Sequence, residues 1–235
     1  MRANLFLMTN LIFLASCATN IPEVVDNSID SSNTELESTV LKNDSFAGVQ
    51  FFMDGMLFFE QGDYARAIIE FQDSIEAGSN SPEVYFNMSE AYWMLRKYDK
   101  SISLAKKAIL LDDSAVDYKI SLGKKYIALN NYELSLDVFN GIALKNPKNA
   151  DVLFIIGDLK AELNDVDGAL LYYQEAYNVD NELTLALEVA AQLAYNSNHR
   201  DLPKIFKKLL LADPSNSEYM RGFLESKSGG NVEEL

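Results

Sequence analysis

Residues 61–71 of this 235-residue chain read QGDYARAIIEF, and this stretch decides the fold. Gly62 is able to take the backbone conformation that ends many helices, and Asp63 is a residue type that caps the start of the next one. On both sides of this turn, apolar residues recur at steps of three and four, as they do along one face of an α-helix. The stretch therefore predicts a junction between two helices, near residues 48–61 and 64–77.

The same arrangement returns every 34 residues along the chain. Small residues stand at Gly55, Ser89, Gly123 and Gly157, and four further positions repeat three, nine, twelve and sixteen residues after each of them. The position three residues on holds Phe58, Tyr92, Tyr126 and Lys160, and the position nine residues on holds Tyr64, Tyr98, Tyr132 and Val166. The position twelve residues on holds Ala67, Ser101, Ser135 and Ala169, and the position sixteen residues on holds Phe71, Ala105, Phe139 and Tyr173. Asn130-Asn131 and Asn164-Asp165 occupy the turns equivalent to Gly62-Asp63. Self-similarity at a fixed period of this length predicts a solenoid of stacked repeats.

This pattern resembles the tetratricopeptide repeat. The resemblance implies two antiparallel helices per repeat, in which a small residue of the first helix lets the second helix pack closely. It predicts an all-α solenoid of about five helix-turn-helix repeats with a C-terminal capping helix. The fifth copy is degenerate, with Ala190 at its small site, Leu202 and Phe206 in its second helix and Pro214 at its close. The repeats are expected near residues 48–81, 82–115, 116–149, 150–182 and 183–216.

The local pattern within each repeat gives the expected helix ends. Further helices are predicted near residues 82–96, 98–111, 116–129, 132–145, 150–163, 166–178, 183–196 and 200–212. A solenoid needs a terminal cap, because the last apolar face otherwise has no neighbour. The segment from Ser217 to Lys227 is the expected capping helix within residues 217–235, and a disordered tail is expected after it.

The first residues of the chain read as a secretory signal. Arg2 gives a positive start, an apolar stretch runs from Ala3 to Leu14, and small residues follow. Leu14-Ala15-Ser16-Cys17 resembles the lipobox of bacterial lipoproteins. This resemblance implies that residues 1–16 are a signal peptide and that Cys17, the only cysteine, becomes the lipid-bearing N-terminus. Apart from this covalent lipid, no cofactor is expected.

Residues 17–47 are expected to form a lipidated, disordered tether. They are acidic and rich in Ser, Asn and Thr, and their hydrophobic periodicity is poor. Such a segment buries too little apolar surface to fold alone. Its expected role is to hold the repeat domain, residues 48–216, away from the lipid surface.

Charge and residue content exclude several functions. The formal charge is −15, and it becomes −16 if Arg2 leaves with the signal peptide, so nucleic-acid binding is not expected. The single cysteine allows no internal disulfide and no cysteine-based metal site. His199, the only histidine, is interpreted as a solvated loop residue, so no metal site and no catalytic residue are predicted. The chain is therefore interpreted as a non-enzyme with no small-molecule substrate.

The resemblance implies a concave groove lined by the first helices, mainly at the second, fifth, ninth and twelfth position of each repeat. The residues expected to line the partner-binding groove are Phe52, Met56, Phe59, Phe86, Glu90, Trp93, Ile120, Lys124, Phe154 and Asp158. Val49, Glu83, Asp117, Ile127, Asp151 and Ala161 also fall on these positions, with Leu187 and Ala191 in the fifth copy. They form an apolar stripe flanked by acids, which favours an extended or helical protein segment with apolar anchors and some Lys or Arg. The alternative for any single one of them is packing against the next repeat or the tether.

Two functional hypotheses follow from these features. The first is a lipid-anchored adaptor of the bacterial cell envelope, at the outer membrane and facing the periplasm, which binds partner proteins and assists an envelope assembly. The second is a surface-exposed lipoprotein that binds host or environmental ligands. A regulatory partner of an envelope enzyme is a third interpretation.

Overall fold

The computed structural model describes residues 46–228, which lie within the unit Asp44–Leu235. The predicted signal peptide, Cys17, nearly all of the predicted tether and the residues after Ser228 lie outside the described residues. Within residues 46–228 the regular structure is helical throughout, as predicted. Over the same range, no helix combines the length and the apolar character that crossing a membrane requires.

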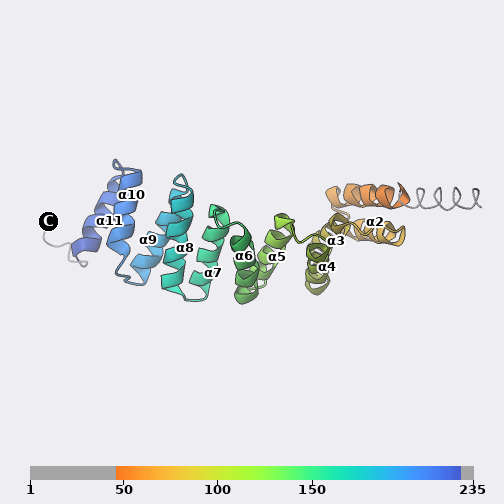
Figure 1. Ribbon diagram of the computed structural model, residues 1–235, viewed down its shortest axis with the longest axis horizontal. Helices are drawn as coiled ribbons and strands as arrows, with labels where there is room; N and C mark the ends of the chain where they lie inside the picture. Colours follow the sequence, from red (N-terminus) through yellow and green to blue (C-terminus); the bar gives the residue numbers. More distant parts are fainter. Residues whose placement is uncertain (1–45, 229–235) are drawn as a thin grey trace, which may run out of the picture. The chain divides into compact units, whose positions relative to one another are not determined.

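The helices follow one another in the predicted order, and each packs against the next (Figure 1). All of the predicted helices are present, and the helix ends that lie within the described residues differ from the predicted ones by two residues at most. After a helix over residues 46–60 come α2 (Tyr64–Glu76), α3 (Pro82–Met94), α4 (Tyr98–Leu111), α5 (Val116–Ala128), α6 (Tyr132–Lys145), α7 (Ala150–Glu162), α8 (Val166–Val179), α9 (Thr184–Asn196), α10 (Leu202–Ala212) and α11 (Ser217–Ser228). The last of these is the predicted capping helix.

The turns inside the repeats share one backbone conformation. It is found at one equivalent residue of every repeat, with φ angles of 77° at Gly62, 58° at Arg96, 56° at Asn130, 60° at Asn164 and 50° at Asn198. This left-handed conformation ends the first helix of each repeat and lets the second one return antiparallel to it. The predicted cap at the first turn is present, because an oxygen of the Asp63 carboxylate accepts a hydrogen bond from the backbone N–H of Arg66 at 3.1 Å.

The small residues of the first helices allow close approach of large rings, as expected. A Cβ added to Gly55 would lie 2.6 Å from the ring of Phe71, and one added to Gly157 would lie 2.7 Å from the ring of Tyr173. In the second repeat the small residue Ser89 faces another small residue, because Ala105 stands where the other repeats have Phe71, Phe139 or Tyr173. The Ser89 hydroxyl also donates a hydrogen bond to the carbonyl oxygen of Ser101 at 2.8 Å. The two helices of each repeat therefore pack through these sites, and the core runs along the solenoid between them.

The fifth repeat differs from the prediction in its register. Its turn residue, Asn198, keeps the spacing of the other turns, so the residue equivalent to Gly157 is Ala191 and not Ala190. The second helix then begins four residues after the turn residue, compared with two in the other repeats. As a result Ile205 and Leu209 are the buried residues of α10, and the predicted Phe206 instead places its ring against Gly222 of α11.

Candidate partner-binding face

The predicted groove residues lie on the 46–60 helix, α3, α5 and α7, the first helices of the first four repeats. We call the surface formed by the second, fifth, ninth and twelfth positions of these helices the first-helix face. Most of its apolar members are half-buried, namely Phe52, Met56, Phe59, Phe86, Trp93, Ile120, Ile127, Phe154 and Ala161, whereas Val49 is exposed. Among its charged members, Lys124 and Asp158 are exposed and Glu90 is half-buried. The half-buried side chains therefore contribute both to packing and to accessible surface.

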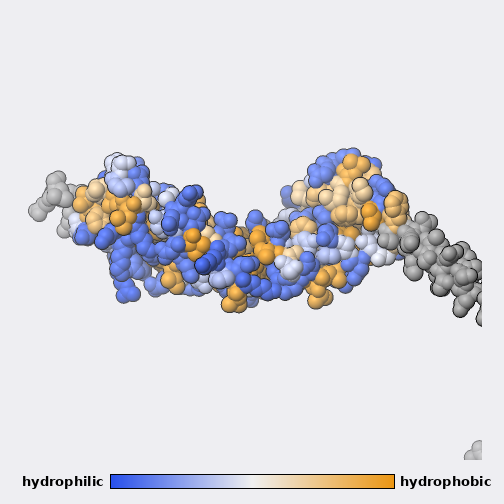
Figure 2. Space-filling view, turned by 45° about the horizontal axis from the view of Figure 1, so that its top comes forward, coloured by the Kyte–Doolittle hydropathy of each residue, from blue (hydrophilic) through white to orange (hydrophobic). Residues whose placement is uncertain are grey.

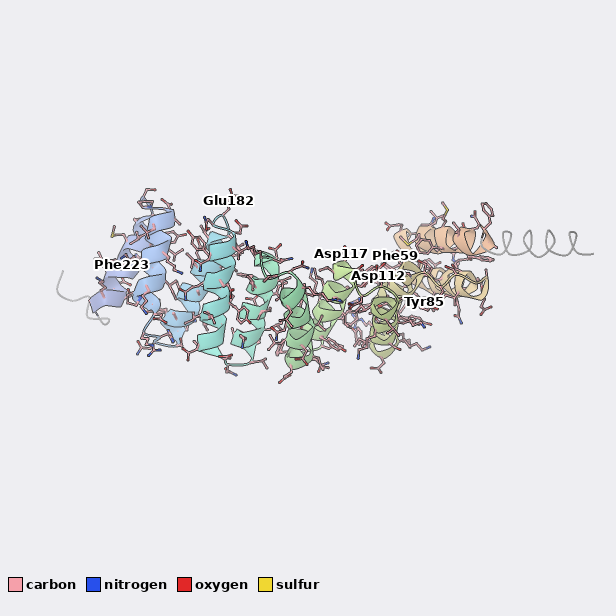
Figure 3. All side chains as sticks on the ribbon, viewed as in Figure 1. Phe59, Tyr85, Asp112, Asp117, Glu182 and Phe223 are labelled. Carbon is pink, nitrogen blue, oxygen red and sulfur yellow. The ribbon has the colours of Figure 1, made fainter. Side chains whose placement is uncertain are left out.

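The aromatic side chains of this face are held by aromatic neighbours. The ring of Phe86 stacks on Tyr118 of the next repeat, with centroids 4.6 Å apart. The other pairs lie within or between neighbouring helices, at centroid distances of 5.9 Å for Phe52 and Phe71, 5.3 Å for Phe59 and Tyr64, 4.7 Å for Trp93 and Tyr98, and 5.4 Å for Phe154 and Tyr173. Figure 3 labels Phe59 near the end of the 46–60 helix and Asp117 at the start of α5. Since the partner rings fix the orientation of these aromatics, little side-chain entropy is left to lose on binding.

A buried ion pair joins the second and third repeats beneath this face. Lys125, whose side chain is 3% exposed, donates to Oε1 of Glu90, whose side chain is 27% exposed. The Ser121 hydroxyl donates to the same Oε1 at 2.6 Å, and the Lys125 ammonium lies 5.6 Å from the centre of the Trp93 ring. The two donors therefore fix the orientation of the Glu90 carboxylate, and the Trp93 ring packs near the same ammonium group.

The sequence interpretation missed Lys125 and named its neighbour Lys124. A signal was present, because Lys125 stands at the position that Ala91 holds in the preceding repeat and Leu159 in the following one, and both of these apolar residues are buried. A lysine at a position that is apolar in neighbouring repeats predicts a buried cation with a partner. Lys124 itself is exposed on the first-helix face.

Asp158 is fixed by a tyrosine from the second helix of its own repeat. The Tyr173 hydroxyl donates to Oδ1 of Asp158 at 2.7 Å. Partial burial of the Asp158 carboxyl group raises its pKa above the usual value. The hydrogen bond from Tyr173 acts in the opposite direction, and the negative charge of Glu162 adds to the increase. In the first and third repeats the equivalent large residues are Phe71 and Phe139, which have no hydroxyl to reach this face.

The prediction that His199 is a solvated loop residue is wrong. Its side chain is only 15% exposed, because the longer turn of the fifth repeat folds it against α8. Nε2 lies 3.0 Å from Oδ1 of Asp167, and Nδ1 accepts a hydrogen bond from the backbone N–H of Asp201 at 3.2 Å. The histidine therefore ties the extra residues of this turn to the fourth repeat. In the described part of the chain no group of three or more His, Cys, Asp or Glu residues is placed to hold a metal ion.

A hollow lies at the C-terminal end of the solenoid. It has a volume of about 1360 Å³ and is bounded by α9, α10 and α11. Its lining includes Phe206 and Tyr219 among polar residues such as Gln192 and Arg221, and of the groove residues named from the sequence only Ala191 belongs to it. The sequence did not indicate this hollow, because it depends on how the capping helix meets a repeat of altered register.

The 46–60 helix carries a second apolar surface, on a side of the helix that packs between repeats elsewhere. Met53 and Leu57 are 60% and 56% exposed, whereas Ala91, which holds the position of Leu57 in the second repeat, is fully buried against its neighbours. Figure 2 shows apolar residues gathered over this end of the unit, while polar residues dominate its middle. The exposure arises because no further repeat precedes this helix among the described residues.

Comparisons with known proteins agree with this architecture. The tetratricopeptide repeat family matches residues 52–116 and 120–192, which is more than half of the chain. The human "Tetratricopeptide repeat protein 12" is 28% identical over 109 residues, a match that covers 46% of this chain and 15% of that protein. The mouse "BBSome complex member BBS4" is 24% identical over 176 residues, covering 74% of this chain and 32% of that protein. The chain thus spans a third or less of these relatives.

Two solved structures show the same fold at low sequence identity. A crystal structure of the MamA protein superposes with a TM-score of 0.61 at 19% identity, covering 74% of this chain and 95% of that one. YrrB, described as a tetratricopeptide-repeat protein with an unusual peptide-binding site, superposes with a TM-score of 0.58 at 18% identity. That match covers 85% of this chain and 98% of YrrB. The predicted all-α tetratricopeptide solenoid is therefore confirmed.

Proposed function

Since the chain belongs to the tetratricopeptide-repeat family, whose members are non-catalytic protein-interaction modules, we propose that it is a scaffold that holds a segment of a partner protein against its first-helix face. One observation carries the proposal. Half-buried aromatic residues stand at the fifth position of three of the four first helices, namely Phe52, Phe86 and Phe154, with the apolar Ile120 at this position of α5, and the charged residues Glu90 and Asp158, which the fold holds in place, flank them. Rigid aromatics with one accessible side are the residues that dominate binding energy at protein interfaces. The peptide-binding site named for YrrB supports this use of the fold.

The second part of the proposal concerns attachment. We infer from Leu14-Ala15-Ser16-Cys17 that the mature chain is lipidated at Cys17 and anchored in the bacterial cell envelope, at the outer membrane and facing the periplasm. Each buried methylene of an acyl chain contributes about 0.8 kcal/mol, so two or three chains give stable anchoring. The net charge of −15 disfavours electrostatic binding to anionic lipids, so the acyl chains are the proposed attachment. A scaffold anchored in this way is suited to assist an envelope assembly.

Truncating Trp93 tests the proposed binding face. We expect Trp93→Ala to weaken the binding free energy of the partner by roughly 1 kcal/mol or more, because the partner no longer contacts the exposed side of the indole. The measurement is crosslinking and pull-down from membrane extracts, together with a thermal melt followed by circular dichroism. Leu110→Ala is the matched control, because Leu110 is 79% exposed and lies at the end of α4, away from the first-helix face. Equal capture by both variants and the unchanged protein would contradict the proposal.

Replacing Cys17 with serine tests the anchor. The substitution removes the thiol that would carry the diacylglycerol, so we expect no incorporation of labelled fatty acid and loss of the protein from the membrane fraction. Ser16→Ala leaves the thiol in place and is expected to retain both, which makes it the control. Labelled fatty acid on the Cys17→Ser protein would show that lipid is attached elsewhere.

A further inference from the structure

We propose that the first-helix face selects an amphipathic helix whose charges follow the order basic, acidic, basic at seven-residue spacing. This inference rests on the proposed binding function and names the class of segment that is bound. The proposed occupant is a helical segment of a partner protein whose charges complement those of the face and whose turns match the spacing of the repeats.

Three charges occupy the same position in three consecutive repeats. Glu90 on α3, Lys124 on α5 and Asp158 on α7 are each separated by one full repeat and all fall on the ninth position of the first helix. Their signs alternate along the solenoid. A segment that crosses these three helices therefore meets an acid, a base and an acid in turn.

Glu90 and Asp158 are each fixed through one carboxylate oxygen, and the other oxygen remains for a ligand. Within residues 46–228, the side-chain hydrogen bonds to Glu90 all reach Oε1, and the one to Asp158 reaches Oδ1. The donors come from below the face, namely Lys125 and Ser121 for Glu90 and Tyr173 for Asp158. The second oxygen of each carboxylate is therefore available to accept from a Lys or Arg of the bound segment. Preorganised acceptors of this kind lose less entropy when they bind.

Lys124 supplies the opposite charge between these two acids. The residue is exposed, and in the described range it makes no salt bridge with an Asp or Glu of the chain. Lys125, one residue later, is already paired with Glu90, so Lys124 is the ammonium group open to a ligand carboxylate. Because of Lys124, a segment that is basic throughout fits this face less well than one with an acid at its centre.

The spacing of the repeats matches two turns of an α-helix. Adjacent first helices are in side-chain contact, as the stacked rings of Phe86 on α3 and Tyr118 on α5 show, and Ile120 of α5 packs against a cluster of buried residues from α6 and α7. Helices in such contact lie about 8–10 Å apart. Seven residues of an α-helix rise about 10.5 Å and bring the side chain back to nearly the same face. Charges at positions i, i+7 and i+14 of the bound helix therefore reach the three ninth positions.

The apolar residues of the face complete the match. The fifth and twelfth positions lie on both sides of each charge and hold Phe86 and Trp93 on α3. On α5 and α7 they hold Ile120, Ile127, Phe154 and Ala161, all half-buried. Apolar residues between the charges of the bound helix would pack on these side chains. Glu83, Asp117 and Asp151, which are exposed at the second positions, form an acidic edge that favours Lys or Arg on the flank of the helix.

The test uses synthetic helical peptides of about 20 residues, long enough to present three charges at seven-residue spacing. One peptide carries the order basic, acidic, basic. A second has the same composition in the order basic, basic, acidic, and a third carries three basic residues. Binding to the purified domain is measured by fluorescence anisotropy at two salt concentrations. We expect the first peptide to bind about tenfold more tightly than the second, with the difference shrinking at high salt.

Variants of the protein make the test specific. Lys124→Glu is expected to reverse the preference, so that the peptide with three basic residues binds more tightly than the basic, acidic, basic peptide. Glu90→Gln combined with Lys125→Met removes both charges of the buried pair, leaves the net charge unchanged and is expected to weaken the first peptide. Lys106→Glu changes the charge of an exposed residue on α4, outside the first-helix face, and is expected to leave the preference unchanged.

Each outcome decides the inference. Equal affinity for the first two peptides, or no reversal in Lys124→Glu, would overturn the charge order. If Trp93→Ala then still abolished binding of both peptides, the proposed binding function would stand and only its selectivity would be wrong. Binding of none of the peptides would also overturn the inference, and the pull-down with Trp93→Ala would judge the proposed function separately.

Discussion

Replacing Glu90 with alanine is expected to destabilise the domain by about 3 kcal/mol, because it leaves a lysine buried without a counter-charge. The Lys125 side chain is only 3% exposed and has Glu90 as its carboxylate partner. The effect belongs at the lower end of the usual range for broken buried pairs, since Glu90 is 27% exposed and water has access to the site. The measurement is urea unfolding followed by circular dichroism in the far ultraviolet, which reports helix content, with the transition midpoint compared between variants.

A double substitution separates the charge from the packing. Lys125→Met keeps the length of the buried side chain and removes its charge, so Glu90→Ala combined with Lys125→Met is expected to regain most of the lost stability. Glu175→Ala removes an exposed acid of α8 and is the control, with an expected change close to zero. If the double variant proved as unstable as Glu90→Ala, lost packing rather than the unpaired lysine would be the cause.

Substituting alanine for Gly123 is expected to destabilise the domain by about 2 kcal/mol, because the added methyl group overpacks the third repeat. A Cβ at this position would lie 2.5 Å from Cε2 of the Phe139 ring, and that ring is fully buried. Either the ring must leave its preferred rotamer or α5 and α6 must separate. Both responses disturb the contact on which the repeat is built.

A second glycine provides the matched control. Gly141 lies within α6 and is exposed, and a Cβ there would meet no atom within 4 Å. Gly141→Ala is therefore expected to stabilise the domain by about 0.5–1 kcal/mol through helix propensity alone. Urea unfolding of both variants gives the comparison. Stabilisation by both substitutions would show that the packing around Phe139 is loose and that the small residue is not needed there.

These two sites are connected through α5. Gly123 sets how closely α5 and α6 pack, and Lys125, two residues later, fixes Glu90 on the preceding first helix. The charge presented at the surface thus depends on residues that a partner never touches. Variants of the buried residues should alter binding as well as stability, whereas Lys124→Glu should alter binding alone.

Much of the fold was predictable from the sequence, because its signals are local and repeated. The period of the repeats, the small residues that face large rings and the turn residues with left-handed backbone depend only on residue types at fixed spacing. Periodicity also placed the aromatic residues on the first helices correctly. It failed at the fifth repeat, where two extra turn residues shift the second helix. The residue pattern of this repeat is weak, so it could not be aligned in register with the other four.

The charges of the binding face were decided by the tertiary structure. Lys124 and Lys125 are adjacent in sequence and chemically identical, yet a helical rotation of about 100° per residue turns one toward solvent and the other toward the preceding repeat. Likewise, His199 is partly buried only because its turn folds back on α8, and the hollow between α9 and α11 exists only where the capping helix meets the altered fifth repeat. The sequence by itself determined which helices form and where they turn. Burial and ion pairing depend on contacts between repeats, which a pattern read within each repeat does not contain.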